Sequence, residues 1–316
     1  MSSLPPAAFY CVSDDRYFPG AVAMINSLRL LGHSEPIFVL DCGLSAEQRE
    51  ILSPHATLVA APREAPPWLL KTVAPLRHPA EVMALIDADI VVTRPLGELI
   101  ARAAEPCVVA IENDTERHVP EWGELLDLGE VRRQPYVSSG LAFLGRAVGE
   151  RVLGLMGELQ DRVNFDHTFW RANVPDYPFL YGDQDVFNAI LASRLERDQL
   201  VALPNRFAPN PPFKGLRVID ERTLRVAHRD GTEPYAVHHF ATKPWLEPTH
   251  HGVYSKLLRR LLTGPGVAMT IEEEKLPLRM RSGPRAWVAR KRVDVRETLY
   301  WHVREPLEAK LGSRRR

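Results

Sequence analysis

The sequence has little of several features that would assign a protein class directly. Only three of its 316 residues are cysteines, and Cys11, Cys42 and Cys107 lie far apart in strand-like segments. They form neither a disulfide framework nor a C-x-x-C metal site, so buried, reduced thiols are expected. The formal net charge is zero, which provides no overall field for binding nucleic acid.

Long apolar runs are also missing. No apolar stretch is long enough to span a bilayer, and the opening "MSSLPPAAFYCVSDD" lacks the basic and apolar regions of a signal peptide. We therefore expect a cytoplasmic protein. What is present is an ordinary globular composition, with 45% hydrophobic and 25% charged residues, and enough chain to bury a substantial core.

The charge is unevenly distributed along the chain. Residues 264–316 contain 13 Lys or Arg against 7 Asp or Glu, a net charge of +6, together with Trp287, Tyr300 and Trp301. Basic and aromatic residues in one segment suit a helix that lies on an anionic membrane. Peripheral contact with the inner face of a membrane is therefore one expectation. A helix that packs on the main domain and exposes a basic face is the other.

Apolar segments with strand and helix character alternate over the first 263 residues. Strands are predicted at 8–13, 36–43, 56–61 and 81–92, and helices at 20–32, 45–52 and 68–76. This order predicts a Rossmann-like α/β fold with a mostly parallel sheet covered by helices on both faces. We expect a catalytic domain over residues 1–263 and a basic, helical tail over 264–316. Ligands of such sheets bind at the carboxyl ends of the strands.

Two carboxylates interrupt the apolar segment "MALIDADIVV". Asp87 and Asp89 stand one residue apart, where they repel each other and are costly to bury without a cation. Mg²⁺ or Mn²⁺ prefers such oxygen ligands and would bridge them to phosphate oxygens. The alternative is a strand end with two solvated acids, because a D-x-D motif alone is common.

Two further polar clusters stand where strands and helices meet. "VSDDRYFPGA" combines Asp14 and Asp15 with Tyr17, an aromatic face with polar groups such as a nucleobase requires. An Asp-rich turn that caps the following helix would explain it equally. In "YGDQDVFNAIL", Asp183 and Gln184 begin an apolar helix, whose N-terminus favours acidic residues in any case.

The last cluster is "VHHFATKPW". Adjacent residues on a strand face opposite sides, so one of His238 and His239 can reach a cleft while the other packs. A neutral histidine as third metal ligand and Lys243 on phosphate oxygens would make a compact diphosphate site. A single strand histidine is otherwise a hydrogen-bonded core residue.

Together these stretches resemble glycosyltransferase family 8, the group of glycogenin and the bacterial lipopolysaccharide galactosyltransferases. The resemblance covers residues 8–262, with "VSDDRY", "LIDADIVV", "SSGLAFLG", "GDQDVFN" and "HHFATKPW" in the family's order. It implies the A-type glycosyltransferase fold and a retaining transfer of a hexose from a UDP-sugar, with Mn²⁺ or Mg²⁺ bound. The acceptor it leaves open is a glycan, a lipid-linked sugar or a protein.

The resemblance also implies roles for individual residues. Asp14 would meet the edge of the uracil and Tyr17 would stack over it, while Lys243 would bind the diphosphate. The catalytic residues would be Asp183 and Gln184, and the metal ligands Asp87, Asp89 and His239, with His238 as the alternative to His239. The full set of donor-binding residues comprises Val12, Ser13, Asp14, Tyr17, Lys71, Asp87, Ala88, Ser138 and Lys243.

Three other functions stay open. A phosphatase would carry its D-x-D on the first strand, whereas three strand-like segments precede this one. A nucleotidyltransferase would carry a Gly-rich, basic loop after the first strand, which "VSDDRYFPG" is not. A protein that binds a nucleotide-sugar without turnover is the third. The mixed segment 112–136, between two predicted strands, is our candidate for acceptor recognition.

Overall fold

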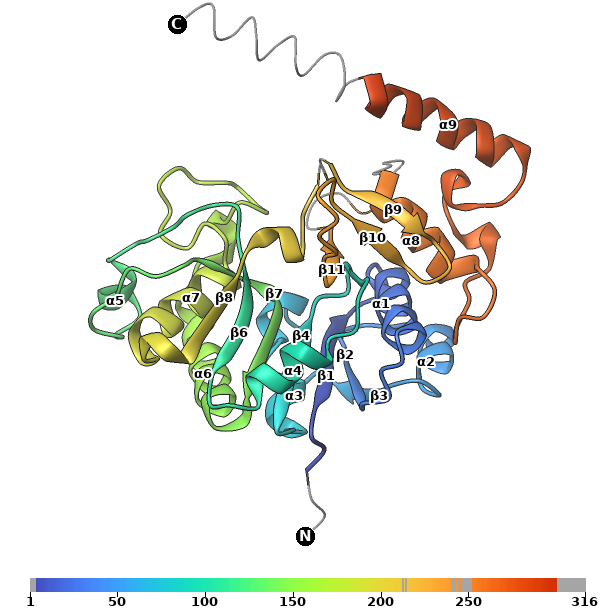
Figure 1. Ribbon diagram of the computed structural model, residues 1–316. Helices are drawn as coiled ribbons and strands as arrows, with labels where there is room; N and C mark the ends of the chain where they lie inside the picture. Colours follow the sequence, from blue (N-terminus) through green and yellow to red (C-terminus); the bar gives the residue numbers. More distant parts are fainter. Residues whose placement is uncertain are drawn as a thin grey trace, which may run out of the picture.

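The computed structural model describes residues 4–211, 213, 215–239, 243, 245 and 252–299, and a seven-stranded sheet lies at its centre (Figure 1). Its strands run in the order β3-β2-β1-β4-β7-β6-β8. They are β1 (Ala8–Ser13), β2 (Ile37–Asp41), β3 (Thr57–Ala60), β4 (Val82–Ile86), β6 (Val108–Glu112), β7 (Val137–Gly145) and β8 (Leu200–Leu203).

The sheet is mostly parallel, as predicted. Strands β1, β2, β3 and β4 run parallel to one another, and β6 is parallel to β8. Only β7 runs antiparallel to the strands beside it, β4 and β6. Because β7 runs in the opposite direction, its first residues, "VSSG", lie beside the carboxyl ends of β4 and β6, where ligands of such a sheet bind.

Helices cover both faces of the sheet because its strands are apolar on both sides. In β1, Phe9 and Cys11 belong to one buried cluster, while Ala8 and Tyr10 belong to the other. The first cluster packs against α1 (Phe18–Leu30), α2 (Ala46–Leu52), α4 (Gly97–Ala103) and α8 (Gly252–Thr263). The second packs against α3 (Val73–Arg77), α5 (Trp122–Leu125), α6 (Arg146–Leu159) and α7 (Asp183–Arg194).

The predicted strand 81–92 is wrong in one respect, because the structure divides it in two. β4 ends at Ile86, and β5 (Ile90–Val92) begins after a turn in which the Ile90 N–H donates to the Asp87 carbonyl at 3.0 Å. β5 leaves the central sheet and pairs antiparallel with β11 (Ala236–His238). The two carboxylates therefore lie in a turn at the carboxyl end of β4 and not inside a continuous strand.

The chain after α8 continues to pack against the main body. The Asn26 side chain in α1 donates to the carbonyls of Leu261 and Met269, both at 2.8 Å, and accepts from the Met269 N–H at 3.0 Å. Met269 and Met280 are buried in the same cluster as α1. The domain boundary at residue 263 thus stays a prediction, and the packed region extends to Met280.

The remaining elements are short, apart from α9 (Pro284–Leu299) at the edge of the molecule (Figure 1). β9 (Arg217–Asp220) and β10 (Arg225–Ala227) form a hairpin. Single 3-10 turns cover Pro67–Leu70, Gln160–Arg162, Phe165–His167, Arg197–Gln199, Asn205–Phe207, Glu273–Lys275 and Leu278–Met280. Within the described ranges, no helix has both the length and the apolar character needed to cross a membrane. Tyr300 and Trp301 lie outside those ranges.

Candidate functional site

A cleft of about 670 Å³ lies at the carboxyl ends of β1 and β4. Most residues that the sequence singled out line it: Val12, Asp14, Tyr17, Lys71, Asp87, Ala88, Asp89, Ser138, Asp183, Gln184, His238 and Lys243. Ser13 and His239 do not line the cleft, and both are fully buried. The structure therefore gathers in one place residues that are separated by more than 200 positions in the chain.

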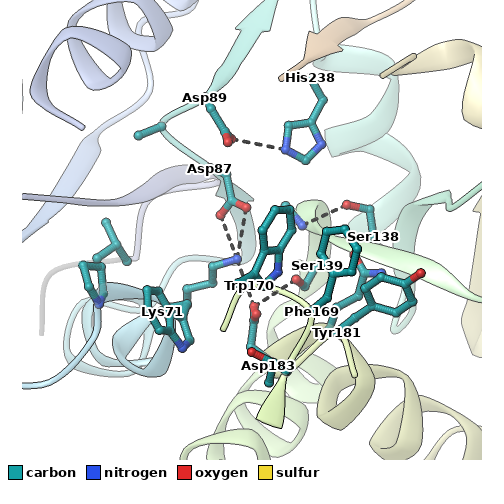
Figure 2. Close-up of a pocket in the computed structure, with 18 of the residues that line it drawn as sticks. Lys71, Asp87, Asp89, Ser138, Ser139, Phe169, Trp170, Tyr181, Asp183 and His238 are labelled. Carbon is teal, nitrogen blue, oxygen red and sulfur yellow. Dashed lines mark hydrogen bonds and ion pairs between the residues drawn. The ribbon is translucent and has the colours of Figure 1, made fainter. Parts of the chain in front are cut away.

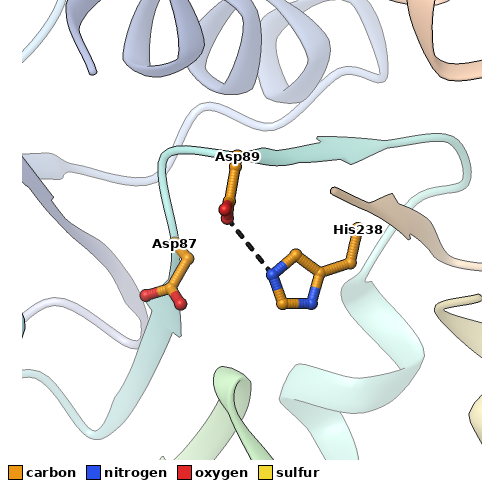
Figure 3. A group of neighbouring side chains, drawn as sticks. All are labelled: Asp87, Asp89 and His238. Carbon is orange, nitrogen blue, oxygen red and sulfur yellow. Dashed lines mark ion pairs between the residues drawn. The ribbon is translucent and has the colours of Figure 1, made fainter. Parts of the chain in front are cut away.

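Asp87, Asp89 and His238 form a compact group in the cleft (Figure 3). One ligand atom from each lies within 4.8 Å of the other two, and the His238 Nε2 is 3.2 Å from the Asp89 Oδ1. Two carboxylates and an imidazole are a suitable donor set for Mn²⁺ or Mg²⁺. The residues present thus fit the divalent cation that the family resemblance implies.

The structure places His238 beside the carboxylates, whereas His239 was the expected ligand. His238 pairs with Ile90 in the β5–β11 ladder and projects into the cleft. His239, the next residue, faces the opposite side, where its ring lies 4.8 Å from the ring of Tyr254. Only the His239 backbone reaches the motif, donating to the Asp89 carbonyl at 3.1 Å. The alternation of side chains along the chain therefore favours His238, the alternative to His239, as the candidate ligand.

Lys71 joins the D-x-D turn to the first turn of α7 (Figure 2). Its Nζ lies 2.9 Å from the Asp87 Oδ1 and 3.0 Å from the Asp183 Oδ2. Burial would lower the pKa of Lys71, but the Asp183 and Asp87 carboxylates outweigh it and raise that pKa above its ordinary value. Lys71 therefore holds the two carboxylates together.

The pKa values of the two aspartates of the motif are shifted in opposite directions. Burial raises the pKa of Asp87, with Lys71 opposing the shift and the Asp89 charge adding to it. Burial acts in the same direction on Asp89, but the Lys243 ammonium and the His238 ring hold the pKa of Asp89 below its ordinary value. Lys243 donates to the Asp89 carboxylate and to the His239 carbonyl. Asp89 is thus the more firmly ionised carboxylate.

The first residues of β7 lie against the carboxylates of Asp87 and Asp183. The Ser139 hydroxyl donates to the Asp183 Oδ2 at 3.0 Å, and the Ser138 hydroxyl accepts from the Gly140 N–H at 3.1 Å. A Cβ on Gly140 would lie 2.8 Å from the Asp87 Oδ2, closer than real contacts allow. A side chain at position 140 would therefore displace the Asp87 carboxylate from its present position.

The first strand–helix junction forms one end of the cleft. The Asp14 Oδ1 accepts from the Tyr17 N–H at 2.8 Å. Asp14 therefore caps this turn, which was the alternative interpretation of the segment. The Lys243 Nζ lies 5.5 Å from the centre of the Tyr17 ring, and Trp245 meets the same ring edge-on at 6.3 Å. The Trp245 indole N–H donates to the Arg16 carbonyl at 2.7 Å, which fixes the C-terminal motif on the first turn.

Asp185, the last residue of "DQD", has a structural role. It is fully buried and accepts from the Arg117 Nε at 2.8 Å, the Tyr136 hydroxyl at 2.7 Å and the Tyr181 N–H at 2.8 Å. Burial raises its pKa, while Arg117 and the other donors act against that shift. These contacts connect α7 to the segment 112–136.

Sequence reasoning missed several residues that line the cleft. Ser139 follows Ser138, which was among the predicted donor-binding residues, and nothing in the sequence distinguishes the two serines. Phe169 and Trp170 lie in a loop without a family motif. The segment 112–136, predicted to recognise the acceptor, contributes Asn113, Asp114 and Thr115 to the lining.

No protein-family profile and no curated protein matches the chain. Among solved structures it is similar to the galactosyltransferase LgtC in complex with donor and acceptor sugar analogs, with TM-score 0.53 and 16% identity over 82% of this chain and 98% of LgtC. For the bifunctional glycosyltransferase WbbM the TM-score is 0.53 and the sequence identity is 17%, over 81% of this chain and 50% of WbbM. For the glycosyltransferase GlyE of Streptococcus pneumoniae TIGR4 the TM-score is 0.50 and the sequence identity is 14%, over 83% of this chain and 61% of GlyE. The chain therefore has the A-type glycosyltransferase fold, and the predicted resemblance to family 8 is confirmed at the level of the fold.

Proposed function

We propose that this protein is a metal-dependent, retaining glycosyltransferase that moves a hexose from a UDP-sugar to an acceptor hydroxyl. The observation that carries the proposal is the group of Asp87, Asp89 and His238, whose ligand atoms lie within 4.8 Å of one another in the cleft. The fold supports it, because the similar structures named above are glycosyltransferases. The resemblance of the motifs supports the choice of UDP and of a hexose.

The charged residues would stabilise the leaving group. A divalent cation held by Asp87, Asp89 and His238 would neutralise charge that develops on the diphosphate. Lys243 is buried beside Asp89, from where its ammonium can reach a diphosphate oxygen. Tyr17 lines the same end of the cleft and offers a ring for the uracil to stack on.

Asp183 would lie next to the anomeric carbon. Its carboxylate is fixed by Lys71 and by the Ser139 hydroxyl, each at 3.0 Å. An ionised carboxylate in this position can stabilise an oxocarbenium-like transition state, as the carboxylates of glycosidases do. Gln184, which also lines the cleft, would donate to a sugar hydroxyl and thereby orient the ring.

The position of the motif separates this proposal from the alternatives. The D-x-D follows β4, the fourth strand along the chain, which does not fit a phosphatase that carries the motif on its first strand. The loop after β1 contains Asp14, Asp15 and Tyr17 instead of a Gly-rich, basic sequence, which does not fit a nucleotidyltransferase. A non-catalytic sensor would bind UDP without turnover.

The test is the release of UDP from a panel of UDP-sugars, with Mn²⁺ and with EDTA. We expect metal-dependent release from one sugar even without an acceptor, because such enzymes hydrolyse their donor slowly. Binding of UDP with no release from any sugar, and with no transfer to an added acceptor, would favour the sensor. No binding of UDP at all would contradict the proposed function.

We also propose that α9 brings the protein to an anionic membrane. Trp287 and Val295 on α9 are 55% and 56% exposed, and Arg285, Lys291 and Arg292 are exposed near them. Exposed apolar side chains together with cations on one helix suit the surface of an anionic bilayer. Co-sedimentation of the full chain with vesicles that contain phosphatidylglycerol, but not with pure phosphatidylcholine, is expected. Equal recovery with both would contradict this role.

A further inference from the structure

One arginine joins the segment 112–136 to the start of α7 from outside the cleft. The Arg117 Nε donates to the Asp185 carboxylate at 2.8 Å, and its Nη2 donates to the Pro178 carbonyl at 2.6 Å. The guanidinium also lies 5.7 Å from the centre of the Trp122 ring. Arg117 does not line the cleft, so the proposed chemistry gives it no direct role. Its contacts instead hold the loop before α7 and the first turn of α7 on a single side chain.

Asp185 is the residue through which this arginine acts on the helix. Its side chain is fully buried. Besides the Arg117 guanidinium, its carboxylate accepts from the Tyr136 hydroxyl at 2.7 Å and from the Tyr181 N–H at 2.8 Å. These three donors fix the carboxylate in place. Because an aspartate side chain is short, a fixed carboxylate also fixes the backbone of the turn that carries it.

The same turn carries Asp183, the carboxylate that we place at the anomeric carbon. Successive residues of an α-helix are rotated by about 100°, so residues 183 and 185 point to nearly opposite sides. Accordingly, Asp183 lines the cleft and Asp185 does not. A rotation of the turn about the helix axis would move both carboxylates together. It would therefore disrupt the contacts of Asp183 with Lys71 and with the Ser139 hydroxyl, each at 3.0 Å.

The rest of α7 is anchored independently of this ion pair. The Asn188 Oδ1 accepts from the Val137 N–H at 2.8 Å, and its Nδ2 donates to the Val137 carbonyl at 2.7 Å. At the other end of the helix, Arg132 donates to the carbonyls of Ala192 and Leu195. Loss of the ion pair at the first turn would therefore release that turn and leave the body of the helix in place.

We propose that Arg117 is a positioning residue: through Asp185 it holds the first turn of α7 so that Asp183 keeps its place beside the anomeric carbon. This inference rests on the proposed function and extends it to a residue outside the cleft. Misplacement of a reacting group by about 1 Å can lower the rate about 10²-fold. A buried ion pair is a poor source of stability compared with apolar residues of similar volume. Its contribution here is to the geometry of the reacting carboxylate.

The test compares Arg117→Met and Tyr136→Phe with Arg132→Met, which releases the opposite end of the same helix. Release of UDP from the UDP-sugar that the wild type hydrolyses gives kcat, and calorimetric titration gives the Kd for UDP. We expect kcat to fall about 10-fold to 100-fold in Arg117→Met and by a smaller factor in Tyr136→Phe, with the Kd for UDP unchanged in both. Arg132→Met should lower the melting temperature and retain the wild-type kcat. A purely structural role of Arg117 would change the melting temperature alone.

Three results would overturn the inference. One is a wild-type kcat in both Arg117→Met and Tyr136→Phe; if Arg117→Met does not fold, Tyr136→Phe, which lacks a single hydroxyl, decides alone. Another is an equal loss of kcat in Arg132→Met, because any loosening of α7 would then suffice. The third is a Kd for UDP that weakens as much as kcat falls, because the donor site as a whole would then be disturbed. Failure of the proposed function is distinguishable, since the wild type itself would then release no UDP from any sugar.

Discussion

The two walls of the cleft are built in opposite ways. The wall formed by the D-x-D turn and β11 holds buried charges in direct contact: Asp89 and Lys243 are 6% and 5% exposed, and the His238 ring is 3.2 Å from Asp89. The wall formed by the loop before α7 holds exposed rings, with Trp170 at 52%. One wall carries charges that are paired within the protein, whereas the other carries aromatic rings that are about half exposed.

This difference corresponds to the two parts of the proposed reaction. Buried, preorganised charges act strongly on a diphosphate because they require no reorganisation when the bond breaks. Exposed rings contribute binding energy through their contact area. Lys71 and Asp183 connect the walls, since the Lys71 Nζ is within 3.0 Å of both Asp183 and Asp87. Variants on each wall should therefore change different kinetic constants.

The largest effect is expected for Asp89→Asn. The variant removes a carboxylate that contacts His238 and Lys243, so metal-dependent turnover should be abolished, a loss of at least about 10²–10³ in rate. Release of UDP with and without Mn²⁺ is the measurement. Asp198→Asn, at an exposed position that is not part of the cleft lining, should retain wild-type activity. Full activity of Asp89→Asn would contradict the metal assignment, and thermal denaturation would check that the variant is folded.

Arg117→Met should have the next largest effect, on stability. It leaves the buried Asp185 carboxylate without the cation that contacts it at 2.8 Å, and breaking a buried ion pair costs about 3–5 kcal/mol. The control is Arg63→Met, which breaks an exposed pair with Asp161 and should cost about 1 kcal/mol or less. Denaturation by urea measures both. Equal losses would mean that the Arg117 pair contributes no more than a surface pair.

Much of the fold was predictable because its signals are local. The alternation of apolar segments predicted β1 with its observed bounds and the start of a helix at Asp183, and the helix predicted at 45–52 is α2, which Ser45 caps. The break after Ile86 was not predictable, because Ile90, Val91 and Val92 are as apolar as β4. Their pairing with β11 depends on a segment about 145 residues away.

His238→Ala and His239→Ala test the two adjacent histidines against each other. His238 contacts Asp89 at 3.2 Å, whereas the His239 ring packs on Tyr254. We expect the Mn²⁺ concentration for half-maximal activity to rise about 10-fold to 100-fold in His238→Ala, in line with losses at metal sites. His239→Ala should lower the melting temperature and leave that concentration unchanged. The reverse pattern would restore His239 as the ligand.

The site was predictable in its residue types more than in its geometry. Side-chain alternation required one histidine in the cleft and one in the core, yet the choice depends on the register between His238 and Ile90, which the sequence does not reveal. The importance of Gly140 depends on the approach of Asp87 from another strand. Phe169 and Trp170 have no periodicity or motif, so only the fold of their loop reveals them as part of the cleft.

The smallest effect is expected for Tyr17→Ala, at the first strand–helix junction. The variant removes the ring proposed to stack on uracil, and the Lys243 Nζ loses a ring whose centre is 5.5 Å away. Stacking of a base on an aromatic side chain contributes about 1–3 kcal/mol, so the Kd for UDP should rise about tenfold. Tyr17→Phe retains the ring and should bind UDP as the wild type does, because the backbone N–H that Asp14 accepts from is unchanged. Calorimetric titration with UDP decides between them: an unchanged Kd in Tyr17→Ala would remove the stacking role, and an equal loss in Tyr17→Phe would transfer it to the hydroxyl.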